Sequence, residues 1–161
     1  MENVDYTSTF IAVAPDLDRP TAVEPLPRGD APTIASATFS LIASAPYTLR
    51  SSDVIFRVWA SRHDVDPASA DEWAAFYSQS HACLRSSDLG KRYGWGIHAD
   101  ADGRLAVYPV GSSEYDGLAA GTAPDGSRVT VTSASESVER SRISTTAARC
   151  PGIVRMVPRY E

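Results

Sequence analysis

The feature that most constrains the fold of this chain is a turn sequence, Asp100-Ala101-Asp102-Gly103, between two largely apolar runs. The flanking residues 93–98 and 104–110 alternate in the manner of strands that bury one face. Asp-Gly between such runs is the strongest short-range signal for a β-hairpin, because both residues tolerate the backbone of a tight turn. The chain is therefore predicted to contain antiparallel sheet.

Further strands are predicted on both sides of this hairpin. Residues 6–13 are β-branched and aromatic and are followed by Pro15, which ends a strand. Residues 128–132 follow a Pro-Asp-Gly turn and have the same character. Residues 153–157 are a short apolar run that we expect to form a final strand.

Helices are predicted mostly before the hairpin. Residues 33–45 have Thr33 as an N-cap and apolar residues at helical spacing, and residues 66–77 carry a Ser/Glu capping box. Residues 51–62 fit either a well-capped helix or an alternating strand, of which we favour the helix. Residues 112–120 are expected to add one or two helical turns.

The length and composition predict one soluble domain. The chain has 161 residues, of which 43% are hydrophobic and 22% are charged. Five prolines in residues 15–32 predict a long loop that wraps the domain. The predicted class is α+β, with an antiparallel sheet and helices packed on one face over residues 1–132. Residues 133–161, which are rich in Ser, Thr and Arg, are expected to form a C-terminal tail.

Several classes of protein are disfavoured by composition and motifs. A net charge of −5 counts against a nucleic-acid partner, and no apolar stretch is long enough to span a membrane. The N-terminus is acidic and lacks a secretory pattern, so we expect a cytoplasmic protein in which Cys83 and Cys150 are free thiols. No phosphate-binding or dinucleotide glycine motif occurs, and the histidines lack zinc-site spacing, so no cofactor and no metal are expected.

The densest polar segment is residues 81–98, where Arg85, Lys91 and Arg92 outnumber the single carboxylate of Asp88. Arginine binds carboxylates and phosphates through two parallel hydrogen bonds. These three residues therefore predict an anionic small molecule as the ligand. A basic surface loop that is paired with the many acids of the protein is the alternative interpretation.

Glycines give this segment an unusual strand face. On a strand, Gly94 and Gly96 share one face with His98, while Trp95 and Ile97 lie on the other. Glycine inside a strand often marks the close approach of a ligand or of another backbone. We therefore add Gly94, Trp95 and Gly96 to the expected ligand-binding residues. A helix packed tightly over the glycines is an equal alternative.

Four residues around this segment have side chains suited to catalysis. His98, Tyr93 and Tyr108 can transfer protons, and Cys83 is a candidate nucleophile because nearby arginines lower a thiol pKa. A buried, small hydrophobic role is the alternative for Cys83. If the protein is an enzyme, an isomerase, cyclase or lyase fits better than a redox enzyme, since no cofactor motif is visible.

The same segment carries a longer pattern. It reads Cys83-Leu84-Arg85-x-Ser87-x-Leu89-x-Lys91-Arg92-Tyr93-Gly94-Trp95-Gly96-Ile97-His98 and continues through Asp102-Gly103-Arg104-x-Ala106-x-Tyr108, with upstream agreement at Tyr6-x-x-Thr9-Phe10-Ile11-x-Val13-Ala14-Pro15-Asp16, Pro46-Tyr47 and Asp53-Val54-x-Phe56. This pattern resembles a small bacterial family known only as a domain of unknown function. The resemblance covers about residues 5–116. It implies a single-domain bacterial cytosolic protein and supplies no activity, cofactor or catalytic residue.

Two hypotheses about function follow, from different classes. The first is that the protein binds an anionic small molecule in a pocket beside the hairpin formed by residues 92–98 and 104–110, with or without proton-transfer catalysis. The second is a non-catalytic interaction module whose arginine-rich surface docks an acidic partner. A third, weaker hypothesis is that Tyr93 and Trp95 stack on a nucleotide or single-stranded nucleic acid, which the net charge disfavours. The sequence leaves a homodimer open.

Overall fold

The predicted hairpin is present in the computed structural model, which describes residues 2–135. Strands β2 (Trp95–Ala99) and β3 (Leu105–Pro109) pair antiparallel along their whole length. Asp100 closes the turn between them, because its Oδ1 accepts hydrogen bonds from the backbone N–H groups of Asp102 at 2.9 Å and Arg104 at 2.8 Å. The hairpin prediction is confirmed.

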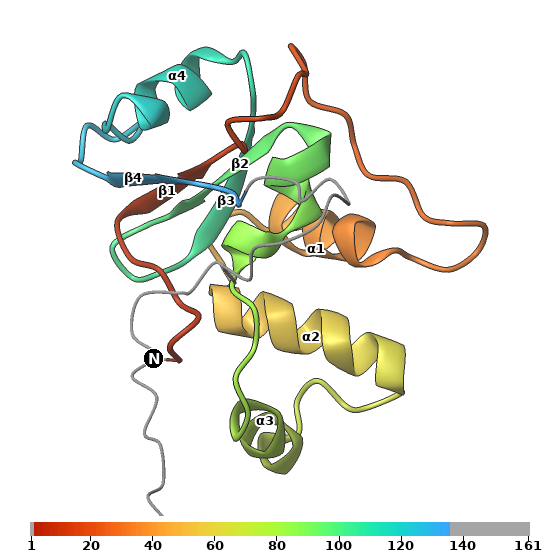
Figure 1. Ribbon diagram of the computed structural model, residues 1–161. Coiled ribbons are helices and arrows are strands. Elements are labelled where there is room, and N and C mark those ends of the chain that lie inside the picture. Colours follow the sequence, from red (N-terminus) through yellow and green to blue (C-terminus); the bar gives the residue numbers. More distant parts are fainter. Residues whose placement is uncertain (1, 136–161) are drawn as a thin grey trace, which may run out of the picture.

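Two more strands complete a four-stranded sheet in the order β3-β2-β1-β4 (Figure 1). Strand β1 (Thr9–Ala12) runs antiparallel to β2, whereas β4 (Thr130–Ser133) runs parallel to β1. The chain leaves β3 at one edge of the sheet and enters β4 at the opposite edge, where it runs in the same direction as β3 and β1. The α+β class is confirmed, with a sheet that is mostly antiparallel.

Three helices cover one side of the sheet, with α2 and α3 lying progressively further from it (Figure 1). They are α1 (Ile34–Ser44), α2 (Ser51–His63) and α3 (Ala70–Tyr77). Thr33 and Ser69 cap α1 and α3 by accepting hydrogen bonds from backbone N–H groups three residues on, as their sequence patterns predict. The helical alternative for the segment that forms α2 is confirmed.

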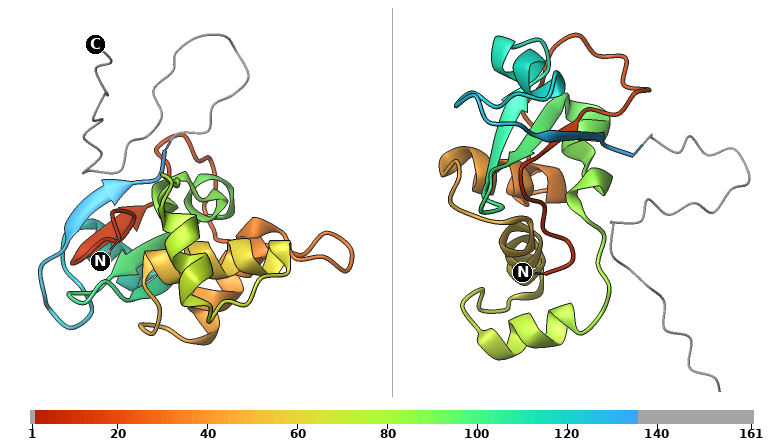
Figure 2. Two further views of the ribbon diagram at one scale, coloured as in Figure 1. Left: turned by 90° about the horizontal axis from the view of Figure 1, so that it is seen from below. Right: turned by 90° about the vertical axis from the view of Figure 1, so that its left-hand side faces the viewer.

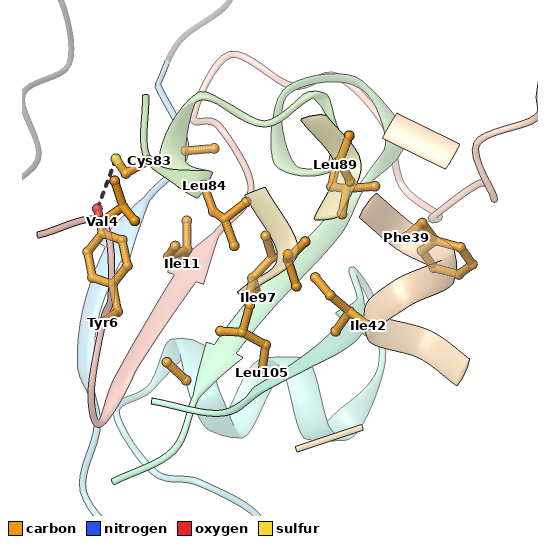
Figure 3. Packing of buried hydrophobic residues seen from close by; sticks show 14 of the residues in the cluster. Val4, Tyr6, Ile11, Phe39, Ile42, Cys83, Leu84, Leu89, Ile97 and Leu105 are labelled. Carbon is orange, nitrogen blue, oxygen red and sulfur yellow. Dashed lines mark hydrogen bonds between the residues drawn. The ribbon is translucent and has the colours of Figure 1, made fainter. Parts of the chain in front are cut away.

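The main hydrophobic core lies between this side of the sheet and the helices (Figure 3). Successive strand residues point to opposite faces, so Ile11 of β1 and Ile97 of β2 both enter this core. Its most deeply buried side chains come from both layers and from the segment after α3, and include Ile42, Val54, Leu89 and Leu105.

The opposite face of the sheet has its own cover. Helix α4 (Ser113–Ala119) packs there, so the prediction of helices on one face holds for α1–α3 but not for α4 (Figure 2). Phe10 of β1 and Tyr115 of α4 meet edge to face, with ring centroids 5.1 Å apart, and Leu118 is fully buried beside them. A second, smaller core therefore lies on the face that carries the alternate residues of β1 and β2.

The proline-rich residues 15–32 contain no helix or strand, as predicted. This loop is attached to the sheet near the start of β2. The backbone N–H of Val23 donates to the carbonyl oxygen of Tyr93 at 2.9 Å, and the indole N–H of Trp95 donates to the carbonyl oxygen of Val23 at 3.0 Å. The two bonds fix Trp95 as an anchor for the loop.

The packed part of the chain extends past the predicted boundary at residue 132. Ala134 is buried in the main core, and the backbone N–H of Ser135 donates to the carbonyl oxygen of Arg85 at 2.8 Å. The rest of the predicted tail, with the strand expected at residues 153–157, lies outside the described residues.

Candidate functional site

Gly96, where we expected an open strand face, lies beneath two aromatic rings. A Cβ atom at this position would lie 2.8 Å from Cε2 of Tyr115 and closer still to the ring of Phe10. Real Cβ atoms do not approach other heavy atoms so closely, so no ligand can occupy this space. The open-face prediction is wrong, and the alternative of close packing over the glycine is correct. The cover comes from β1 as well as from a helix.

Gly94 is not part of the strand. It ends η2 (Leu89–Tyr93), a single π-helical turn, and its φ of +80° lies in the left-handed region that favours glycine. A Cβ here would also lie 3.1 Å from Cα of Ala22 and 3.2 Å from Cγ1 of Val110. The expectation that Gly94 and Gly96 share one strand face is therefore wrong, because β2 begins only at Trp95.

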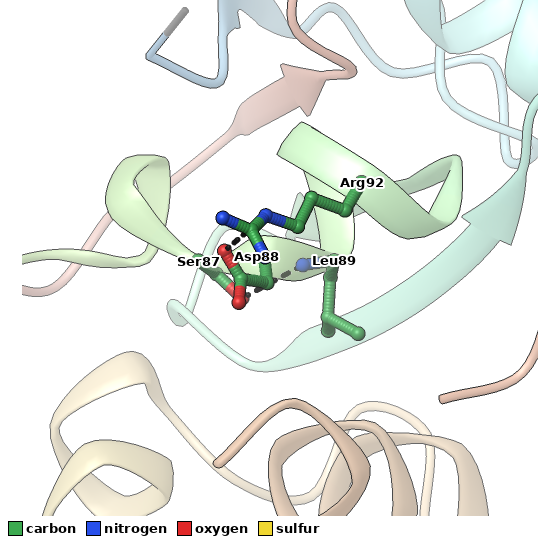
Figure 4. A network of polar contacts seen from close by, with 4 residues as sticks. All are labelled: Ser87, Asp88, Leu89 and Arg92. Atoms are coloured by element: carbon green, nitrogen blue, oxygen red, sulfur yellow. Dashed lines mark hydrogen bonds and ion pairs between the residues drawn. The ribbon is translucent and has the colours of Figure 1, made fainter. Parts of the chain in front are cut away.

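The predicted anion-binding cations have separate neighbours. The Nε–H of Arg85, in η1 (Leu84–Ser86), donates to the carbonyl oxygen of Ser133 at 2.8 Å and so holds the end of β4. Arg92 is 71% exposed and lies 3.6 Å from the carboxylate of Asp88, one helical turn earlier (Figure 4). Lys91 is half-buried on the same turn. This arrangement offers no support for a shared grip of Arg85 and Arg92 on one anion.

Cys83 does not meet His98. Its Sγ accepts a hydrogen bond from Oη of Tyr6 at 3.1 Å and lies in the main core with Ile97 (Figure 3). His98 follows Ile97 on β2 and points to the other face of the sheet. Cys83 is also disulfide-bonded, so the free-thiol prediction is wrong for it. A Cys83–His98 pair of nucleophile and base is therefore excluded. Cys150 lies outside the described residues.

Two of the predicted catalytic residues, His98 and Tyr108, both contact Tyr47, which was not among the predicted catalytic residues. Oη of Tyr47 lies 2.9 Å from Nδ1 of His98 and 2.7 Å from Oη of Tyr108. Tyr108 pairs with Gly96 across the hairpin, so it is a diagonal neighbour of His98 on the same face of the sheet. We call Tyr47, His98 and Tyr108 the relay cluster. Tyr93 lies outside it, on η2.

Burial favours the uncharged forms of His98 and Tyr47 in the relay cluster. His98 is 4% exposed, and this burial lowers its pKa, against smaller opposing effects of the carboxylates of Asp100 and Asp125. Burial also raises the pKa of Tyr47, helped by its hydrogen bond with Tyr108. Nε2 of His98 is buried and has no hydrogen-bond partner among residues 2–135. A neutral imidazole therefore presents one unsatisfied nitrogen.

Tyr47 adopts an uncommon backbone conformation to reach this place. Its φ is +56°, in the left-handed region, although it is not glycine. Such a residue costs about 1–3 kcal/mol unless its neighbours compensate. Its backbone N–H donates to the carbonyl oxygen of Leu105 at 2.7 Å, which fixes the residue against the edge of β3.

A cavity of about 350 Å³ lies elsewhere, between α1, α2 and residues 81–87. We call it the helix cavity. Its walls are mostly aliphatic and aromatic, and they include Ile34, Ile55, Val58, Trp59, Phe76 and Leu84. Ile34 is 61% exposed at the cavity.

One wall of the helix cavity is a run of four rings. His63 stacks on Trp59 with centroids 4.5 Å apart, Trp59 meets Phe76 at 4.9 Å, and His81 stacks on Phe76 at 3.6 Å. Nδ1 of His63 and Nε2 of His81 lie 2.8 Å and 2.7 Å from backbone carbonyl oxygens. A carbonyl only accepts, so these nitrogens carry the protons, and the other ring nitrogens are acceptors while the histidines are neutral.

The charge at the helix cavity comes from Arg62. Within residues 2–135 no Asp or Glu lines the cavity, while His63 and His81 do. Sequence reasoning singled out the 81–98 segment but missed Arg62 and His63. A wider hollow of about 570 Å³ lies on the other side of α2, beneath the proline-rich loop, and its lining includes both Arg57 and Glu24.

Comparison with known proteins confirms the resemblance to a family of unknown function. No curated protein and no solved structure matches the chain. Within residues 2–135, no helix has both the length and the apolar character needed to cross a membrane. Because the match spans residues 1–125, the chain belongs to the family described as "Family of unknown function (DUF6157)".

Proposed function

We propose that this protein binds a small organic anion with an apolar, flat body in the helix cavity. The observation that carries the proposal is the combination, within residues 2–135, of an aromatic wall with the cation of Arg62 and hydrogen-bonding side chains, and without a carboxylate. A volume of about 350 Å³ falls within the range of small-molecule sites, which are mostly apolar with a few polar groups.

The lining explains how such a ligand is held. An aromatic body packs against Trp59 and Phe76, and its burial contributes about 25 cal/mol for each Å² of apolar surface removed from water. Arg62, which also donates a long, exposed hydrogen bond from Nη1 to the carbonyl oxygen of Pro32 at 3.4 Å, then binds the carboxylate at the rim, where its guanidinium can form two parallel hydrogen bonds. The ligand class is the one expected from the sequence, at a different place in the fold.

The alternative of an arginine-rich docking module receives less support. The guanidinium of Arg85 is already bonded to the end of β4, and Arg92 is paired with Asp88. The bacterial source and cytoplasmic location stay predictions from the sequence. The homodimer, which the sequence leaves open, is untested as well.

Calorimetric titration with 2-naphthoate and with its neutral analogue 2-naphthamide tests the proposal. We expect the naphthoate to bind more tightly, and Arg62→Gln to weaken its binding about tenfold, since hydrogen bonds to charged groups contribute roughly 1.5–3 kcal/mol. Arg57→Gln is the matched control, because Arg57 lies on the same helix but lines the other hollow. Equal affinities of the two compounds, or equal effects of the two variants, would contradict the proposal.

A blocking variant tests the location of the site. Ala82 is exposed and lines the helix cavity, so Ala82→Trp places a large ring in the cavity without disturbing the core. We expect this variant to lose binding of both compounds while its melting temperature stays close to that of the unmodified protein. Retained binding would move the ligand away from the helix cavity.

A further inference from the structure

We propose that the relay cluster is a proton-transfer site, separate from the helix cavity, in which Nε2 of His98 is the base toward a small polar molecule that carries an O–H, N–H or acidic C–H group. Two independent features of the described residues point to it. The first is the buried Nε2 without a hydrogen-bond partner, and the second is the left-handed backbone of Tyr47. Both are unfavourable for folding, and both occur in one cluster of three side chains. Strain of this kind concentrates at functional sites.

The direction of the hydrogen bonds in the relay cluster decides whether the unpaired Nε2 carries a proton or a lone pair. If Tyr108 donates to Tyr47 and Tyr47 donates to Nδ1 of His98, then Nε2 carries a buried N–H with nothing to accept it. In the reverse order Nδ1–H donates to Tyr47, Tyr47 donates to Tyr108, and the half-buried Tyr108 donates to water. Buried N–H groups without an acceptor are rarer in proteins than unsatisfied acceptors. The reverse order therefore leaves Nε2 with a lone pair, which is the form of a base.

With this direction of hydrogen bonds, the relay cluster can accept a proton from a substrate at Nε2 and release another to water at Tyr108. A substrate X–H gives its proton to Nε2, the X–H electron pair stays on X, and an Nε2–H bond forms. Nδ1 passes its proton to Tyr47, Tyr47 passes its own to Tyr108, and Tyr108 releases one to water. When Nε2 returns a proton to an atom of X, the chain runs in reverse. The net result is proton exchange or isomerisation of the substrate, without an oxidant or reductant.

The charges that face His98 suit this step. The carboxylates of Asp100 and Asp125 both act on its imidazole and favour its protonated form. They therefore stabilise the imidazolium that exists after Nε2 captures a proton and before Nδ1 releases one, while burial keeps the resting ring neutral. Asp125 is fully exposed, so its effect is weakened by solvent and salt.

Diethyl pyrocarbonate tests whether a small molecule reaches Nε2. The lone pair of a neutral imidazole attacks its carbonyl carbon, the anhydride C–O bond breaks, and ethyl carbonate leaves. Peptide mass spectrometry of the folded, full-length protein then gives the rate of modification at each histidine. Because His98 is 4% exposed, we expect it to react more slowly than the exposed His63 but still to be modified in the folded protein. No reaction at His98 when His63 is fully modified would overturn the proposal.

Variants and a ligand separate this site from the helix cavity. Tyr47→Phe removes the acceptor of Nδ1–H, so we expect a fall of several-fold in the modification of His98, while the control Tyr93→Phe has no effect. Bound 2-naphthoate should protect His81 and leave His98 unchanged, so either proposal can fail alone. Long-range ¹H–¹⁵N NMR of His98 completes the test. A proton on Nε2 in the resting protein would overturn the assignment of His98 as the base.

Discussion

The relay cluster and the helix cavity are built in different ways. Two members of the relay cluster, His98 and Tyr108, lie on adjacent strands of one hairpin, and His98 is almost completely buried. The helix cavity is open and mostly apolar, and it joins α1 and α2 to residues 81–87. Strand register fixes the reactive side chains, whereas the packing of helices against a distant segment leaves space for a ligand. This fold therefore keeps the hydrogen-bonded cluster on its strands apart from the cavity between its helices.

The close packing over Gly96 is tested by adding a single methyl group there. Gly96→Ala adds a Cβ that meets the rings of Phe10 and Tyr115, so we expect a loss of about 1–3 kcal/mol in the free energy of unfolding. The matched control is Gly117→Ala in α4, where the nearest atom to a Cβ is the carbonyl oxygen of Thr122 at an ordinary 3.5 Å. This control should be neutral or stabilising by up to about 1 kcal/mol. Denaturant unfolding of both variants gives the values, and equal stabilities would mean that the face over Gly96 is open.

The contrast between Gly96 and the hairpin itself shows what the sequence could predict. The Asp-Gly turn, the Thr33 and Ser69 caps and the helical spacing are local signals, and the structure confirms each of them. The ring cover over Gly96 comes from β1 and α4, which no local pattern relates to β2. The error at Gly94 has a different cause. A π-helical turn ends at Tyr93, so the strand starts later than its alternation suggests.

The candidate sites divide in the same way. His98 and Tyr108 were predictable because hairpin register brings alternate residues of paired strands together. Tyr47 was not, because its left-handed backbone after Pro46 has no sequence signal that distinguishes it from an ordinary loop residue. Arg62 and His63 were missed because their role depends on which face of α2 meets residues 81–87, and only the packed structure decides that.

A smaller effect is expected when the relay cluster loses its central hydroxyl. Tyr47→Phe leaves Nδ1 of His98 and the hydroxyl of Tyr108 without their shared partner, so we expect a loss of about 1–2 kcal/mol. Tyr93→Phe, outside the cluster, should change stability by less than about 0.5 kcal/mol. Chemical denaturation at neutral pH measures both. If the two variants are equally stable, the hydrogen bonds of the cluster contribute nothing to the fold.

The pH dependence of stability tests the neutral state of His98. Its pKa is lower in the folded protein than in the unfolded chain, so below about pH 6.5 the unfolded state binds more protons. The stability that neutral His98 contributes is complete above that pH and is lost as the pH falls toward the folded pKa. His98→Gln should therefore show a smaller decline between pH 7.5 and 5 than the unmodified protein. The carboxylates of Asp100 and Asp125 face the ring, and the hydrogen bonds with Ser127 lower the pKa of Asp125. If the melting temperatures of the two proteins decline equally, burial does not lower the pKa of His98 in the folded protein.

The smallest expected effect concerns Arg92, which the sequence placed in the anion site. Its guanidinium is 71% exposed and lies 3.6 Å from the carboxylate of Asp88, a geometry that contributes less than about 0.5 kcal/mol to stability. Arg92→Ala should therefore leave both the melting temperature and the affinity for 2-naphthoate nearly unchanged, whereas Arg62→Gln weakens that affinity. Calorimetric titration of the two variants side by side decides between the two places for the anion. If Arg92→Ala loses as much affinity as Arg62→Gln, then Arg92 on η2 contributes to binding as much as Arg62 on α2 does. That result would contradict the placement of the anion at Arg62 alone.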